Sequence, residues 1–411
     1  MMGVSRRPRR RAVPGPALIA VSALVAAAGC ESPVPFYPPG QGAPDAPVIA
    51  VGAPAPATLD GESSPPEPPS AAPRSADTPD VPANVYAATG PGMLGPESRD
   101  LPPRVYVPNA ATGTADVIDQ RTGRLLGRVR TGGAPTLIVP GWNLRRLWVH
   151  DLVNGTAVPI APRSAHRGES LRISRPGPLY FTPDGRDAFL MVGRLARIDF
   201  RHPKTMKPHG SMKLPCQGAT GADHSADASF LVASCPPSGR LIRVDPSRRS
   251  VTATLRLPAG SRPDDLRLSP DGRTFLVADA AKGGLWQVDA ARFRVTGFIR
   301  TGPGAHGLVL GRESQRMFVL GGDGTVSSVH LATQRVTRLW RTPSGRSPLA
   351  GGVSADGETL WLTDPAVGTV YAVSTRTGRT VHAVKVGGRP GNACVYPQPA
   401  RYSLGGPGLY R

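Results

Sequence analysis

Short turn-forming sequences recur at a nearly constant interval along this chain. Pro-Asp-Gly occurs at 183–185 and 270–272 and Ala-Asp-Gly at 355–357, and Asp-Gly favours tight hairpins because glycine accepts a positive φ. Related turn sequences lie at 141–143, 226–227, 312–314 and 397–399, which makes the interval 42 to 44 residues throughout. A repeat of this length restricts the fold strongly, because each unit must be one supersecondary structure that stacks on its neighbours.

Each repeat contains four short segments with the residue pattern of β-strands. An aromatic and β-branched run follows each turn, as at 275–277, and the next segment ends on a turn former such as Asp245. The third segment alternates in polarity, as over 252–257, and the fourth follows a Gly/Pro loop, as over 263–268. Four strands in about 43 residues make one propeller blade, and no helical periodicity competes with them. We therefore predict an all-β, seven-bladed β-propeller over residues 104–411.

The two ends of this domain are predicted to meet in one blade. The segment 104–130 supplies three strands, and the last repeat supplies an inner strand over 391–397. Sharing a blade would remove the free edges that otherwise invite aggregation. The seven inner strands are expected to begin near Pro135, Pro176, Ala219, Pro263, Ala305, Pro348 and Pro390.

These repeats resemble a known family. The segments 104–109 (Arg-Val-Tyr-Val-Pro-Asn) and 269–279 are similar to the YVTN-type, YncE-like β-propeller repeat, and so are the loops at 131–135 and 386–390. The resemblance covers 104–411 and implies the fold but little about activity, since the family includes surface proteins, binding proteins and scaffolds of redox enzymes. Ala228 and the turn at 313–314 depart from the repeat and predict two irregular blades.

The first thirty residues have the pattern of an export signal. Arginines at 6–11 precede an apolar stretch over 17–29, and small residues lead directly to Cys30. This junction resembles the bacterial lipobox, which implies that residues 1–29 are a lipoprotein signal peptide and that Cys30 is lipidated. We expect an exported protein anchored by lipid at the outer face of the cytoplasmic membrane or at the cell surface. The alternative is an ordinary secretory signal cut near Ala28.

A proline-rich segment separates Cys30 from the repeats, and the charge changes sign at its end. Residues 31–103 include 19 prolines and carry a net charge of −7, so residues 30–103 are predicted to be a disordered tether. The stretch 85–94 is less proline-rich and is left unassigned, with docking on the folded domain as the alternative. Residues 104–411 carry +22. A positive domain outside the cell favours polyanions, namely anionic lipid headgroups, wall phosphate polymers or acidic partners, over nucleic acid. The alternative is that the arginines reflect a compositional bias, and a monomer is expected in either case.

Four cysteines are present. With Cys30 assigned to the lipid, Cys216 and Cys235 fall on neighbouring strands of one blade and are predicted to form a disulfide, as expected outside the cell. Cys394 is expected to be a buried thiol. A metal site is disfavoured because no Cys-x-x-Cys occurs, and no cofactor is predicted.

Aligning the repeats brings several polar residues to one mouth of the central tunnel. Asp264 and His306 occupy equivalent positions in neighbouring blades, and the other candidates are Asp265, Asp223, His224 and Arg267. A histidine among carboxylates could bind a metal ion or transfer protons. The structural alternative is that Asp264 and Asp265 cap a loop, Asp223 pairs with Arg267, and His306 packs beside Gly307.

Two classes of function follow. The first is a non-enzymatic surface lipoprotein whose propeller binds a protein or an anionic envelope polymer. The second is an extracytoplasmic enzyme or redox-enzyme scaffold, of lactonase, lyase or metal-dependent type, with its site around His306. Known nucleophile, zinc and phosphate-loop motifs do not occur in the sequence, so no catalytic residue is assigned.

Overall fold

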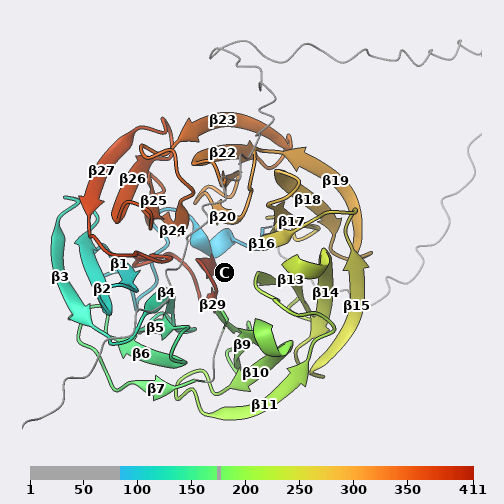
Figure 1. Ribbon diagram of the computed structural model, residues 1–411, viewed down its shortest axis with the longest axis horizontal. Helices are drawn as coiled ribbons and strands as arrows, with labels where there is room; N and C mark the ends of the chain where they lie inside the picture. The colour runs from blue at the N-terminus through green and yellow to red at the C-terminus, as the bar shows by residue number, and fades with distance from the viewer. Residues whose placement is uncertain (1–83, 174–176) are drawn as a thin grey trace, which may run out of the picture. The chain divides into compact units, whose positions relative to one another are not determined.

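The polypeptide forms seven antiparallel β-sheets arranged as blades around a central axis (Figure 1). The structure, a computed structural model, describes residues 84–173 and 177–411. The seven-bladed propeller predicted from the repeats is confirmed. The predicted signal peptide, Cys30 and the tether as far as residue 83 lie outside the described residues.

One blade joins the two ends of the repeat region. Strand β28 (Cys394–Tyr396) pairs with β1 (Arg104–Asn109), which is followed by β2 (Thr114–Asp119) and β3 (Leu125–Arg130). Val105 lies opposite Val395 in this pairing. The predicted closure is confirmed.

Five further blades consist of four consecutive strands each. The first contains β4 (Pro135–Pro140), β5 (Leu147–Asp151), β6 (Thr156–Ile160) and β7 (Leu171–Arg172). The next two contain β12 (Ala222–His224), β13 (Leu231–Cys235), β14 (Arg240–Asp245), β15 (Ser250–Arg256), β16 (Pro263–Leu268), β17 (Thr274–Asp279), β18 (Gly284–Asp289) and β19 (Arg294–Arg300). The last two contain β20 (Gly307–Leu310), β21 (Arg316–Leu320), β22 (Thr325–His330), β23 (Arg335–Arg341), β24 (Leu349–Val353), β25 (Thr359–Asp364), β26 (Thr369–Ser374) and β27 (Thr380–Lys385).

The direction of the strands distinguishes two faces of the disc. Each inner strand begins on one face, which we call the entry face, and ends on the other, the exit face. Because the strands of a blade are antiparallel, the entry face carries the loops from each outer strand to the next blade and the hairpins between second and third strands. The exit face carries the other turns, including the Asp-Gly turn before β17.

Bulky side chains of the second strands fill the space between blades. Trp148, Phe189, Phe275, Phe318 and Trp361 come from second strands of different blades, and each is fully buried. Burying a side chain of this size stabilises the fold by roughly 1.5–3 kcal/mol. The outer strands instead alternate between exposed and partly buried residues, as in β15.

The two blades predicted to be irregular are regular four-stranded sheets, so that prediction is wrong. Ala228 and Ser314 adopt φ values of 63° and 56°, close to the 72° of Gly272 in the Asp-Gly turn. Their amides donate to Ser225 and Gly311 over 3.1 and 2.9 Å, which closes the same tight turn. The turn geometry is therefore kept without glycine, at the steric cost of a left-handed residue.

The remaining blade is extended across the tunnel by the C-terminal segment 398–411. It contains β8 (Leu179–Phe181), β9 (Ala188–Val192), β10 (Arg197–Arg201) and β11 (Pro208–Lys213), with β29 (Ser403–Gly405) and β30 (Leu409–Tyr410) added beside β8. Gly405 of β29 pairs with Tyr180 of β8. Figure 1 shows β29 and the C-terminus at the centre of the ring. This extension was not predicted.

The folded body also begins earlier than the predicted boundary at Arg104. Val85 and Tyr86 are buried in a core cluster with Leu268 and Phe275. The Val85 amide donates to the Pro270 carbonyl over 2.8 Å, and the Tyr86 hydroxyl donates to the Leu268 carbonyl over 2.8 Å. A short 3-10 helix, η1 (Ala87–Thr89), follows near the centre of the ring (Figure 1). Residues 84–103 thus belong to the folded body, because Val85 and Tyr86 pack against its exit face. Two more such helices are η2 (Gly193–Leu195) and η3 (Pro236–Ser238).

The cysteines pair as predicted. Cys216, in the loop before β12, is bonded to Cys235 at the end of β13, and their Cα atoms are 6.1 Å apart. Cys394 is a free, buried thiol, and burial raises its pKa. No helix in the described part of the chain is long and apolar enough to cross a membrane.

Candidate functional site

The predicted site residues line the central tunnel at two different depths. Asp264 and His306 lie towards its entry end, near the beginnings of β16 and β20. Asp265 follows Asp264, and the others, Asp223, His224 and Arg267, lie deeper on β12 and β16. The depth order expected from the aligned repeats is therefore observed, but the partners of these residues differ from those expected.

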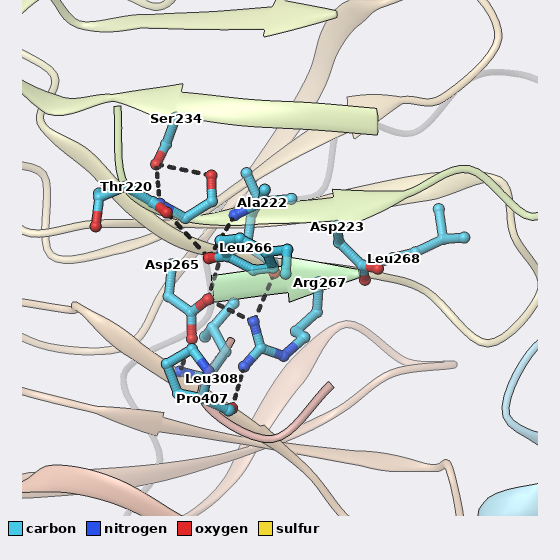
Figure 2. Close-up of polar contacts among 12 residues, drawn as sticks. Thr220, Ala222, Asp223, Ser234, Asp265, Leu266, Arg267, Leu268, Leu308 and Pro407 are labelled. Carbon is cyan, nitrogen blue, oxygen red and sulfur yellow. Dashed lines mark hydrogen bonds and ion pairs between the residues drawn. The ribbon is translucent and has the colours of Figure 1, made fainter. Parts of the chain in front are cut away.

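Arg267 is held in the middle of the tunnel by three oxygen acceptors. Its guanidinium contacts the Asp265 carboxylate and donates to the carbonyls of Leu266 and Pro407, each over 2.8 Å (Figure 2). Asp265 in turn accepts from the Leu308 amide of β20 over 3.0 Å. Burial raises the pKa of Asp265, and the charge of Arg267 offsets part of that rise. This pair joins two inner strands and the C-terminal segment.

Asp223 pairs with Arg411 instead of Arg267, so the expected Asp223–Arg267 pair is wrong. The Arg411 guanidinium donates to Asp223 over 2.8 Å, and the Leu268 amide donates to the other carboxylate oxygen over 2.8 Å. The guanidinium also lies 4.4 Å from the ring centre of Tyr86, a favourable cation–π contact. Burial raises the pKa of Tyr86 to about 12. The two chain segments outside the repeats thus meet at this carboxylate.

His224 is enclosed next to this pair and is not placed for proton transfer. Its side chain is buried and lies edge-on to Phe189, with ring centres 5.9 Å apart. Burial lowers the pKa of His224 to about 4, and the nearby Asp223 offsets this only in part. The ring therefore stays neutral at physiological pH.

The entry end of the tunnel holds the less enclosed members of the set. The two ring nitrogens of His306 lie 2.8 Å from the Gly304 carbonyl oxygen and 2.9 Å from that of Pro348, so its contacts run to backbone carbonyls. Asp264 is half-buried, and burial, followed by the charge of Asp265, raises its pKa to about 6. Asp264 can therefore exchange a proton near neutral pH.

Neighbouring inner strands approach closely near the entry end, and the terminal segments fill most of the exit end. A Cβ on Gly221 would lie 2.4 Å from the Asp264 carbonyl oxygen, and one on Gly391 would lie 2.1 Å from that of Thr136. Glycine at these positions lets adjacent inner strands touch near the entry end. At the exit end, a cavity of about 110 Å³ remains between the two terminal segments and the turns that follow β8 and β12, and Val85, His224 and Tyr402 are among its lining residues. That space suits a few water molecules and is far smaller than typical ligand pockets, which are about 300–1,000 Å³.

Sequence reasoning missed the residues that close the tunnel: Tyr86, Pro407 and Arg411. The available signal was the apolar content of the flanking segments, such as Leu404 and Leu409, which are buried. Among the described residues, no group of three or more His, Cys, Asp and Glu side chains is arranged to hold a metal ion. The arrangement in the tunnel is thus a set of satisfied ion pairs with one carboxyl, Asp264, able to titrate near neutrality.

Comparisons with known proteins support the fold. No family model matches the chain, and no curated protein matches it. A functionally unknown protein from Desulfotomaculum acetoxidans has a TM-score of 0.61 at 14% identity, covering 71% of this chain and 98% of that one. Apo AztD from Citrobacter koseri has a TM-score of 0.56 at 13% identity, covering 73% and 99%. The Kuenenia stuttgartiensis hydrazine synthase has a TM-score of 0.54 at 14% identity, covering 66% and 94%. At these identities the likeness concerns the β-propeller fold alone.

Proposed function

We propose that this protein is an exported, non-enzymatic β-propeller that is anchored through Cys30 and binds a protein or an anionic polymer of the cell envelope. The observation that carries the proposal is the closed tunnel. Two ion pairs, Asp265–Arg267 and Asp223–Arg411, already engage the polar side chains that a site inside the tunnel would need. Binding then falls to the outer surfaces of the disc.

The disulfide fits an exported protein, because such bonds persist in oxidising compartments. The anchor is tested by replacing Cys30 with Ala. This change should move the protein from the membrane fraction to the soluble extracellular fraction, since the lipidated thiol is lost. A serine substitution at Cys394, which is buried in the propeller, is the matched control and should leave the distribution unchanged. Equal membrane retention of both variants would refute the lipid anchor.

The binding role is tested by chemical cross-linking of the anchored protein in intact cells, followed by identification of the captured material. A His306→Gln and Asp264→Asn double variant should capture the same partner, because both residues lie at the tunnel mouth rather than on the outer surface. Loss of capture in this variant would place the function at the tunnel instead.

One observation favours the alternative, an enzymatic site at the tunnel mouth. The pKa of Asp264, raised to about 6 by burial and by Asp265, is suited to general acid–base catalysis near neutral pH. A fold that also occurs in a hydrazine synthase is compatible with enzymes. A turnover that disappears in Asp264→Asn while the protein stays folded would support this alternative.

A further inference from the structure

Every outer strand of the propeller ends on a basic residue. The seven strands and their last residues are β3 (Arg130), β7 (Arg172), β11 (Lys213), β15 (Arg256), β19 (Arg300), β23 (Arg341) and β27 (Lys385). These strands form the perimeter of the disc (Figure 1). We call this set the basic ring. One blade contributes one member, so the charges are distributed around the whole circumference.

The members of the basic ring occupy equivalent positions on one face. Each pairs with the first residue of the neighbouring third strand, as Arg130 does with Thr114 and Arg300 with Gly284. Third strands begin on the entry face, so the ring lies at that edge of the disc. All seven residues are exposed.

The basic ring has almost no acidic partners. Among the described residues, the one ion pair that involves it joins Arg341 to Asp323, with 3.7 Å between nitrogen and oxygen. Loops on the same face add the exposed cations Arg194, Arg262, Arg346 and Arg389. Their positive charges therefore remain available to a ligand.

Acidic side chains are distributed differently between the two faces. On the entry side, four of the described acids are buried within or beneath the loops: Asp116, Asp151, Asp279 and Asp364. Asp264 and Asp323 are partly exposed there. The exit-face turns carry exposed acids in several blades, including Asp184, Asp227, Asp271, Asp356 and Glu358. A general excess of arginine would raise the basic content of both faces, but it would not remove exposed acids from one of them.

We infer that the entry face is a docking surface for a polyanionic chain of phosphodiester units, and that the basic ring supplies its main contacts. This inference rests on the proposed binding function and specifies its surface and ligand class. A ring of separate charges matches a long flexible polymer with a repeating charge, because one chain carries enough phosphates to contact several blades at once.

The course of the chain favours such a polymer over the anchoring bilayer. Val85 enters the disc at the exit face, where its amide contacts Pro270. The basic ring is therefore on the face opposite the point where the segment from Cys30 joins the propeller. The described segment 84–103 packs on the exit side and so leaves the entry face free for a polymer chain.

The test compares two triple variants of the full chain that lose the same charge. Arg130→Gln, Arg256→Gln and Arg300→Gln alter the basic ring, whereas Arg121→Gln, Arg273→Gln and Arg376→Gln alter exposed arginines of the exit-face turns. Binding to synthetic poly(glycerol phosphate) is measured by calorimetry at several salt concentrations, and thermal melting checks that each variant is folded. The ring variant should bind at least about tenfold more weakly than the unmodified chain, since each basic residue near an anionic surface contributes on the order of 1 kcal/mol. The control should change by less than about threefold, and binding should weaken with salt because exposed charges are screened within about 10 Å at 0.1 M.

Equal weakening of both triple variants would overturn the assignment to the entry face. Binding to phosphatidylglycerol vesicles but not to the polymer would overturn the phosphodiester chain in favour of a bilayer. If neither probe binds while cross-linking in cells still captures a protein partner, this inference fails and the proposed binding function stands. If neither probe binds and cross-linking captures no partner, both this inference and the proposed binding function fail.

Discussion

The two ends of the central tunnel contain similar residue types but use them differently. At the exit end, Asp223 is fully buried and is held by Arg411 and the Leu268 amide. At the entry end, Asp264 is half-buried and has no ion pair among the described residues, and its pKa is raised to about 6. The difference arises because the segments 84–103 and 398–411 pack on the exit side. A polar residue of the tunnel is therefore held in an ion pair where a terminal segment covers it, as Asp223 is, and can titrate where none does, as Asp264 can.

Deleting residues 398–411 should have the largest effect on this comparison. The deletion removes the buried side chains Leu404, Leu409 and Tyr410 and leaves the Asp223 charge without Arg411. We expect unfolding in denaturant to show a loss on the order of 5–10 kcal/mol. Deleting residues 31–83 is the control and should leave the unfolding midpoint unchanged, because a proline-rich segment contributes no core. If the two deletion variants have the same unfolding midpoint in denaturant, the segment 398–411 does not stabilise the propeller.

Replacing Asp223 with Ala addresses the exit-end ion pair alone. The substitution leaves the Arg411 guanidinium buried without its carboxylate, which should cost about 3–5 kcal/mol. The double variant Asp223→Asn and Arg411→Met removes both charges and should be more stable than Asp223→Ala in the same denaturant titration. If the double variant is no more stable than Asp223→Ala, the Asp223–Arg411 charge pair is not what closes the exit end.

Removing the disulfide tests how the entry end is held. Cys216 and Cys235 are separated by 19 residues in sequence and connect the loop before β12 to β13 on the entry face. Replacing both with Ser should lower the free energy of unfolding by about 2–4 kcal/mol. Peptide mapping without reductant should recover the two residues joined and Cys394 free. A disulfide that includes Cys394 would contradict the described pairing.

The substitution Asp264→Asn tests whether the entry end of the tunnel, unlike the exit end, makes the free energy of unfolding depend on pH near neutrality. The pKa of Asp264 is about 6 in the folded protein, compared with about 3.9 in an unfolded chain. The folded state therefore favours the protonated form, and stability is lost as pH rises from 4 through 6. The substitution should stabilise the protein by about 3 kcal/mol at pH 7.5 and by only about 0.5 kcal/mol at pH 4. An equal effect at both pH values would show that Asp264 is ionised normally in the fold.

The smallest expected effect concerns a turn on the exit face. Ala228 has a φ of 63° where the equivalent residue in another blade is Gly272. Ala228→Gly should raise the free energy of unfolding by roughly 0.5–1 kcal/mol, because glycine adopts this conformation without steric strain. Gly272→Ala is the reciprocal control and should destabilise by a similar amount. Thermal melting of both variants decides the matter, and a destabilised Ala228→Gly protein would contradict the explanation.

The repeat alone determined much of the architecture. Turns every 42 to 44 residues predicted seven blades, the closure between β1 and β28, and the bond between Cys216 and Cys235. Such features can be read from sequence because each repeat folds with local partners and because equivalent positions fall at the same depth of the tunnel. The depth order of Asp264, Asp223 and Arg267 followed from the same alignment.

Only the tertiary structure decided the partners of those residues. Tyr86 and Arg411 lie outside the repeats, so no periodicity predicts where their segments return, and their contacts join residues far apart in sequence. Whether the stretch 85–94 docks was left open by the sequence for the same reason: its packing depends on the surface that the assembled blades present. The basic ring likewise needed the structure, because the spacing of arginines becomes a surface property only once the strand ends are known to share one face. Local turn and strand preferences act within a blade, whereas packing across the tunnel and charge on a face arise after all seven blades have closed.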